Sequence, residues 1–164
     1  MQTSWRALAF GVAVVLVAVL GADIERLSAQ ASDPRIGTWK LNVAKSKYSP
    51  GPAPQSLTGK VEASGEGETA TTEGVNADGT PTMTQYTANF DGKDYPLTGS
   101  QNADTVSLKR IDARTTERTD KKGDKVVQTL TRVVSQDGKT MTVTVKGTNA
   151  QGQAVDNVVV FEKQ

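Results

Sequence analysis

Three charged residues, Arg110, Glu117 and Arg132, have the types and the spacing to bind an anion. A guanidinium group is a flat fork of N–H donors that matches a carboxylate or a phosphate, and a neighbouring carboxylate can hold it in place. The hairpin turns described below place all three side chains on one face of a sheet, together with Leu108 and Leu130. Two arginines around one glutamate leave a net positive charge. The sequence therefore predicts a site for an anionic group within an apolar wall.

A plainer interpretation of the same residues stays open. Glu117 could simply neutralise the two arginines. Alternatively, the hairpin turn at 112–113 could be displaced by one residue, which would direct Arg110 and Glu117 to solvent. Residues 114–122 are polar on both faces, so the hydrophobic pattern specifies the register of this segment only weakly.

The composition removes most catalytic chemistry. The chain of 164 residues contains no histidine and no cysteine. It therefore lacks the usual general base, the commonest metal ligands and any thiol nucleophile. No Gly-x-Ser-x-Gly elbow is present to carry a serine nucleophile. We expect no enzyme, no metal site and no cofactor, and the net charge of +1 does not indicate a nucleic-acid partner.

The first residues predict a secretory signal helix over 1–31. Arg6 supplies positive charge, and the apolar run 7–20 is shorter than the roughly 20 residues that a membrane-spanning helix needs. Ala29-Gln30-Ala31 supplies the small residues of a cleavage site. We expect cleavage after Ala31, export to the periplasm or the medium, and a mature domain over 32–164 without a stable membrane anchor. An uncleaved leader that acts as an anchor is the alternative.

Turn dipeptides divide the mature chain into short strands. Asp78-Gly79, Asp91-Gly92 and Asp137-Gly138 are typical of two-residue hairpin turns, because glycine adopts positive φ at little cost. The segments between such turns are rich in threonine and valine and show no helical periodicity. We expect about ten strands, over residues 36–43, 55–64, 67–77, 80–90, 93–98, 104–111, 113–122, 125–135, 139–148 and 154–163.

The expected registers place apolar residues opposite one another. A two-residue turn fixes which residues face each other across a hairpin. The turn at Asp137-Gly138 places Val134 opposite Met141, and the turn at Asp91-Gly92 places Tyr86 opposite Leu97. The agreement of two independent hairpins supports the strand assignment.

The same reasoning gives the face of the charged residues. A turn at 123–124 places Glu117 opposite Leu130, and a tight turn at 112–113 places Leu108 opposite Glu117. Both registers together predict that these residues share one apolar face.

Ten sequential hairpin strands must protect their edges, and closure into an antiparallel up-and-down β-barrel does so. The strand 36–43 alternates in hydrophobicity and carries Trp39, the only tryptophan outside the leader. We expect Trp39 to plug the base of the barrel, and a contact with the ligand is the second interpretation of this residue. Tyr86 and Tyr95 are expected in the barrel wall.

Two short motifs resemble a known superfamily. Gly37-Thr38-Trp39 resembles the Gly-x-Trp signature of lipocalins and fatty-acid-binding proteins, and residues 159–163 resemble the closing strand of the intracellular fatty-acid binders. The whole mature chain is similar to a group of secreted bacterial lipocalin-like proteins. This resemblance implies a barrel with an internal cavity for a small, largely apolar ligand.

The chain departs from that pattern in two places. Fatty-acid binders carry a helical lid between their first two strands, whereas residues 44–54 are rich in proline and cannot form one. Their closing strand presents an arginine and a tyrosine to the ligand carboxylate, where Val159 and Phe161 stand in this chain.

The sequence therefore predicts an exported, monomeric binding protein for a small hydrophobic or anionic amphiphilic ligand. The alternative is a structural or interaction barrel of the cell envelope that binds no ligand because side chains fill its interior. The candidate ligand-binding residues are Arg110, Arg132, Glu117, Trp39, Tyr86, Tyr95, Leu108 and Leu130.

The cleavage site gives a first testable prediction. N-terminal sequencing of the exported product is expected to begin at Ser32, because the small residues at 29 and 31 fit the signal peptidase site. Recovery of a chain that still begins at Met1, in the membrane fraction, would show that the leader is an anchor.

Overall fold

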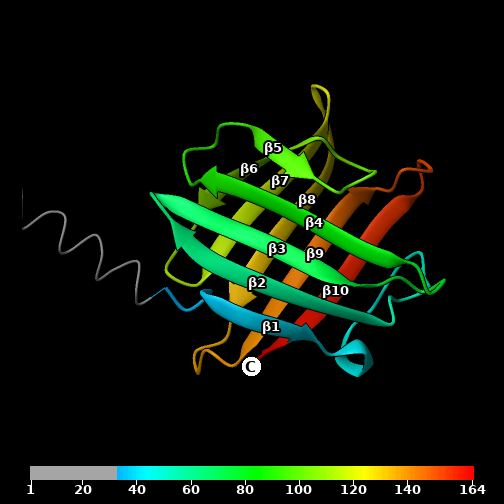
Figure 1. Cartoon of the computed structure of the whole chain (residues 1–164), viewed down its shortest axis with the longest axis horizontal. Coiled ribbons are helices and arrows are strands. Elements are labelled where there is room, and N and C mark those ends of the chain that lie inside the picture. The colour runs from blue at the N-terminus through cyan, green and yellow to red at the C-terminus, as the bar shows by residue number, and fades with distance from the viewer. Residues whose placement is uncertain (1–32) are drawn as a thin grey trace, which may run out of the picture. The chain divides into compact units, whose positions relative to one another are not determined.

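A computed structural model describes residues 33–164, and the predicted leader lies outside the described residues. Ten antiparallel strands close into one barrel, in which the first strand lies beside the last (Figure 1). Within the described residues no helix is long and apolar enough to cross a membrane. The strands are β1 (Gly37–Leu41), β2 (Ser56–Ser64), β3 (Gly67–Val75), β4 (Pro81–Asn89), β5 (Tyr95–Thr98), β6 (Thr105–Arg110), β7 (Thr115–Lys122), β8 (Lys125–Val134), β9 (Thr140–Thr148) and β10 (Ala154–Lys163).

The strand order confirms the up-and-down barrel. Each strand pairs with the next one along the chain, and β1 closes the barrel by pairing with both β2 and β10. Trp39 lies opposite Gly59 on one side and Lys163 on the other. All ten expected strands are present, with ends that lie within two residues of the prediction.

The two hairpins with apolar cross-strand pairs have the expected registers. Val134 lies opposite Met141 across β8 and β9, and Tyr86 lies opposite Leu97 across β4 and β5. These four residues are buried. A shift of one residue would have turned each apolar face to solvent, so the pattern left a single acceptable register.

The register predicted for β7 is wrong by one residue. Leu108 and Leu130 both lie opposite Arg118, and Glu117 lies opposite Lys109 and Thr131 instead. Because neighbouring residues on a strand point to opposite faces, Arg118 takes the inward position expected for Glu117. Glu117 therefore lies on the outer face of the barrel.

Two local features cause this shift. The turn between β6 and β7 is wider than two residues, because the Asp112 carboxylate accepts hydrogen bonds from the backbone N–H groups of Arg114 (2.7 Å) and Thr115 (2.8 Å). On the other side, a β-bulge between Asp120 and Lys121 shifts the pairing of β7 with β8 by one residue. The turn at 123–124 itself is tight, as expected, and the bulge sits beyond it.

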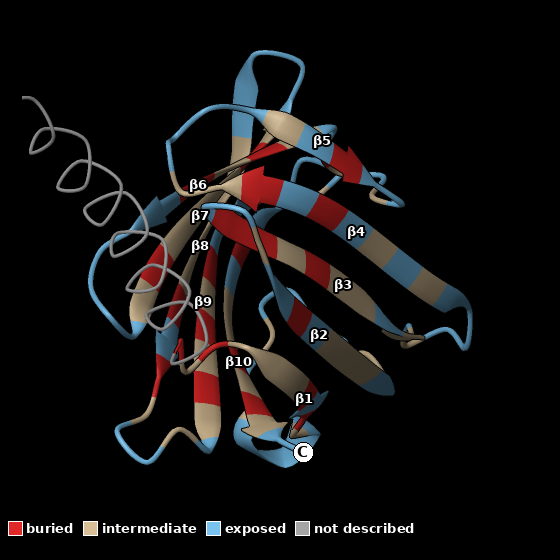
Figure 2. Cartoon of the chain, turned by 60° about the vertical axis from the view of Figure 1, so that its left-hand side comes forward, coloured by how far each residue is buried: buried red, intermediate tan, exposed pale blue. Residues whose placement is uncertain are grey.

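The indole of Trp39 is buried in the core of the barrel. This side chain is 0% exposed, and its Nε1 donates a hydrogen bond of 2.8 Å to the carbonyl oxygen of Arg35. Leu108 and Val106 are buried in the same core cluster. Figure 2 shows the alternation that builds this interior, with buried and exposed residues following one another along β4. The complete burial of Trp39 agrees with a place in the core.

The loop between β1 and β2 is extended, as its prolines predict. It begins with η1 (Val43–Lys45), a single turn of 3-10 helix and the only helical element in residues 33–164. Lys47 then pairs with Val158 of β10 through two backbone hydrogen bonds of 2.7 and 2.9 Å. The loop therefore runs along the barrel wall and forms no helical lid.

Removal of the plug is expected to destabilise the barrel strongly. Trp39→Ala should lower the free energy of unfolding by about 3–5 kcal/mol, the usual loss for a large buried aromatic side chain. Urea unfolding followed by circular dichroism measures the change. The control is Val133→Ala on the outer face, where the side chain is exposed and the change should stay within about 0.5 kcal/mol. Equal losses in both variants would show that Trp39 is not the plug.

Candidate functional site

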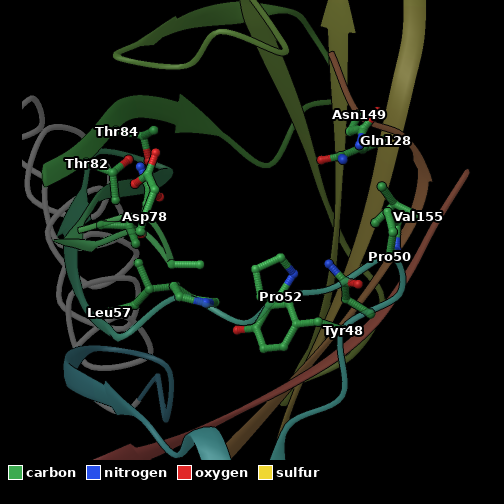
Figure 3. Close-up of a pocket in the computed structure, with 15 residues that line it drawn as sticks. Tyr48, Pro50, Pro52, Leu57, Asp78, Thr82, Thr84, Gln128, Asn149 and Val155 are labelled. Atoms are coloured by element: carbon green, nitrogen blue, oxygen red, sulfur yellow. The ribbon is translucent and has the colours of Figure 1, made fainter. Parts of the chain in front are cut away.

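The barrel contains an internal cavity of about 340 Å³ that continues into a wider mouth of about 760 Å³. The mouth is bordered by the prolines of the loop before β2, including Pro50 and Pro52 (Figure 3). Six residues line both spaces and form what we call the neck: Tyr48, Leu57, Thr72, Thr84, Gln128 and Asn157. The interior is therefore hollow, and both volumes fall in the range of small-molecule sites.

Most of the cavity wall is apolar. The side chains come from the inward positions of β2, β3, β8, β9 and β10, where alternation turns every second residue to the interior. They are Val61, Ala70, Leu130, Met141, Val143, Val145, Val159 and Phe161. A hydrocarbon chain in the cavity would therefore contact apolar side chains along this wall.

A buried carboxylate lies at the deep end of the cavity. Glu68 of β3 is 1% exposed and accepts a hydrogen bond of 2.6 Å from the Tyr86 hydroxyl and one of 3.1 Å from Arg35 Nη1. Arg132 Nη2 lies 2.6 Å from the same carboxylate. We call these four residues the Glu68 cluster. Two of them, Tyr86 and Arg132, line the cavity.

The guanidinium group of Arg132 has an N–H donor without an acceptor. Its side chain is 8% exposed, yet its Nε and Nη2 atoms have no hydrogen-bond partner among the described residues. Nη2 forms an ion pair of 2.6 Å with the Glu68 carboxylate, so Nε is the donor that is left without an acceptor. A buried guanidinium N–H without an acceptor is costly, and a ligand acceptor in the cavity would remove this cost.

A second arginine lines the cavity beside Arg132. Arg118 Nε and Nη2 donate to the two carboxylate oxygens of Asp120 at 2.6 and 2.7 Å. The Arg118 guanidinium also lies 4.9 Å from the centre of the Tyr86 ring. Sequence reasoning missed this pair, because the alternation was assigned one residue out of step.

A further group of charges lies outside the cavity lining. The Asp33 carboxylate accepts hydrogen bonds from Arg35 and from Arg110, the latter at 2.8 Å. Both guanidinium groups lie over the Phe90 ring, at 4.6 and 4.5 Å from its centre. Arg110 is therefore a structural partner of Asp33 rather than part of the cavity wall.

The structure brings together only part of the predicted site. Arg132, Tyr86 and Leu130 line the cavity as expected. Trp39 and Leu108 are buried in the core but are not in the cavity lining.

The other predicted residues lie elsewhere. The Tyr95 hydroxyl donates to Asp91 at 2.9 Å and is outside the cavity lining. Glu117, as shown above, is on the outer face. Sequence reasoning missed Glu68, although it stands two residues from inward-facing Ala70 and an alternation count over β3 would have found it.

The pKa shifts indicate that the Glu68 cluster is charged at neutral pH. Burial alone would raise the pKa of Glu68, but Arg132, the Tyr86 hydroxyl and Arg35 outweigh it and hold this pKa below its ordinary value. Burial alone would lower the pKa of Arg132, but neighbouring Tyr86 and Glu68 raise it above the ordinary value. Burial raises the pKa of Tyr86 to about 12, so its hydroxyl remains a donor.

The buried charges at this end of the barrel balance, because Arg35, Arg118 and Arg132 stand against three carboxylates. The fourth arginine, Arg110, is 40% exposed and lies outside the cavity lining. Within residues 33–164, no group of three or more histidine, cysteine or acidic side chains could hold a metal ion. The arrangement can bind an anion inside an otherwise apolar cavity.

Comparisons with known proteins give a likeness in structure only. No protein-family model matches the chain, and no curated protein matches it. Among solved structures, the chain is similar to the zebrafish ileal bile acid-binding protein complexed with cholic acid, with a TM-score of 0.49 and 13% sequence identity. The match covers 80% of this chain and 99% of that one. A likeness at this level does not assign the chain to a family.

The pKa of Glu68 predicts how stability depends on pH. Because this pKa is lower in the folded chain than its ordinary value of 4.5, ionised Glu68 adds stability above that value. This stability is lost as the pH falls through the folded pKa. Glu68→Gln should therefore be less stable than wild type at pH 7 but should show a flatter loss between about pH 5 and pH 3.

Urea unfolding at a series of pH values measures this slope. The matched control is Asp156→Asn, since Asp156 lies on the outer face and its ion pair with Lys146 is exposed. If the slope of Glu68→Gln equals that of wild type, the lowered pKa of Glu68 is wrong.

Proposed function

We propose that the protein is an exported binding protein that holds a small, largely apolar amphiphile in the barrel cavity, with the anionic head on Arg132. The observation that carries this proposal is the buried guanidinium of Arg132, which lines the cavity and has an Nε–H donor without an acceptor. A carboxylate or phosphate supplies such an acceptor.

The neighbouring side chains support this role. Glu68 holds Arg132 by charge, so the guanidinium is positioned before a ligand arrives. Arg118 lies on the same wall and is fixed by Asp120. The hydrocarbon part of the ligand packs against the apolar wall between these residues and the neck. Burial of this hydrocarbon supplies most of the driving force for binding.

The alternative is a structural or interaction barrel that binds no small molecule. That interpretation expected side chains to fill the interior. A cavity of about 340 Å³ that opens to a wider mouth favours the binding protein instead. Export as a soluble monomer is part of the proposal and rests on the leader sequence, which the cleavage experiment tests.

Arg132→Gln should weaken the binding of an anionic amphiphile by about 1.5–3 kcal/mol, the size of a hydrogen bond to a charged group. That is roughly a 10- to 150-fold rise in Kd. Isothermal titration calorimetry with hexadecanoic acid measures the change. Hexadecanol, which has the same chain but no charge, should bind both proteins about equally. Arg132→Lys keeps the charge without the fork and should lie between wild type and Arg132→Gln.

The control is Lys146→Gln, which removes the same charge from the outer face of the barrel. This variant should bind the acid like wild type. Equal weakening by Lys146→Gln and Arg132→Gln would assign the effect to overall charge. Absence of binding by any ligand to folded wild-type protein would favour the interaction barrel.

A further inference from the structure

The neck separates the apolar cavity from the mouth and is itself mostly polar. Five of its six side chains carry a hydroxyl or an amide, namely Tyr48, Thr72, Thr84, Gln128 and Asn157. The deep wall, in contrast, is built mainly of aliphatic side chains. A ligand that extends from Arg132 toward the mouth therefore passes from an apolar to a polar environment.

Tyr48 is fixed in the neck by the residues on either side of it. Lys47 pairs with the Val158 backbone, and the Ser49 N–H donates to Asn157 Oδ1 at 2.7 Å. These contacts tie the loop to β10 and hold the Tyr48 ring between the cavity and the mouth. Figure 3 shows this ring beside the pocket, with its hydroxyl end directed away from its own backbone.

The Tyr48 hydroxyl is buried and has no hydrogen-bond partner in the part of the chain that the structure describes. Burial raises the pKa of Tyr48 to about 12, so the group is a neutral donor and acceptor at physiological pH. A methylene chain packed against it would leave this hydroxyl without a partner, which costs affinity. A ligand oxygen at the same place would satisfy it.

The distance to Arg132 locates that oxygen on the ligand. Gln128 of the neck and Arg132 lie four residues apart on β8, which corresponds to about 13 Å along the strand. An extended chain whose head lies on Arg132 therefore reaches the neck near its middle, not at its head.

We infer that the barrel selects an oxygenated anionic amphiphile, whose hydroxyl or keto group in mid-chain hydrogen-bonds to Tyr48 at the neck. This inference rests on the proposed function, because it requires the anionic head at Arg132. It adds a second polar contact, and with it a preference among ligands of equal charge and length.

The test compares hexadecanoic acid with its monohydroxy and monoketo isomers, in which the oxygen moves along the chain. Isothermal titration calorimetry should show tightest binding for one mid-chain position, about three- to tenfold tighter than the parent acid. Tyr48→Phe should abolish this preference and should bind the parent acid at least as tightly as wild type, because no hydroxyl is then left without a partner. Tyr95→Phe removes an equivalent hydroxyl outside the cavity and should keep the preference.

The outcomes separate the inference from the proposed function. If the parent acid binds but every oxygenated isomer binds equally, or if Tyr48→Phe keeps the preference, the contact at the neck is wrong and the binding function stands. If neither the parent acid nor any isomer binds to folded protein, both are wrong. Binding of the parent acid by Tyr48→Phe also shows that the variant is folded.

Discussion

The buried carboxylate of Glu68 is the group on which the interior of this barrel depends. A carboxylate without contact to water is very unfavourable unless charges and hydrogen bonds compensate it. Its partners come from three distant parts of the chain: Arg35 before β1, Tyr86 on β4 and Arg132 on β8. These contacts connect opposite walls across the interior.

Much of the fold could be predicted because hydrophobic alternation and turn chemistry agreed. The pairs Val134–Met141 and Tyr86–Leu97 are apolar on one face, so only one register buries them. β7 carried no such information, because it is polar on both faces. Its register depends on the Asp112 turn and on the bulge after Asp120, and neither leaves a hydrophobic signal.

The candidate site was predictable only where it coincides with this alternation. Arg132 was found because it stands among inward-facing apolar residues of β8, and that position does not depend on β7. Glu68 was missed although alternation along β3 places it inward, and its pairing with Arg35, 33 positions away, follows from barrel closure and not from local pattern. The error at Glu117 had little consequence for the chemistry, since Arg118 and Asp120 bring an arginine–carboxylate pair to the same wall.

The unequal ends of the cavity determine how an amphiphile would enter. At the deep end, Arg132 offers an Nε–H donor that has no acceptor. At the other end, the mouth includes Asp78, whose pKa is held below its ordinary value by hydrogen bonds from Thr80, so that it repels an anion at neutral pH. In the reverse orientation, the hydrocarbon chain would pack against the charged Glu68 cluster. The cluster would then be covered without any compensating polar group from the ligand. On the function proposed for the barrel, an anionic ligand is therefore expected with its head inward and its chain directed to the neck.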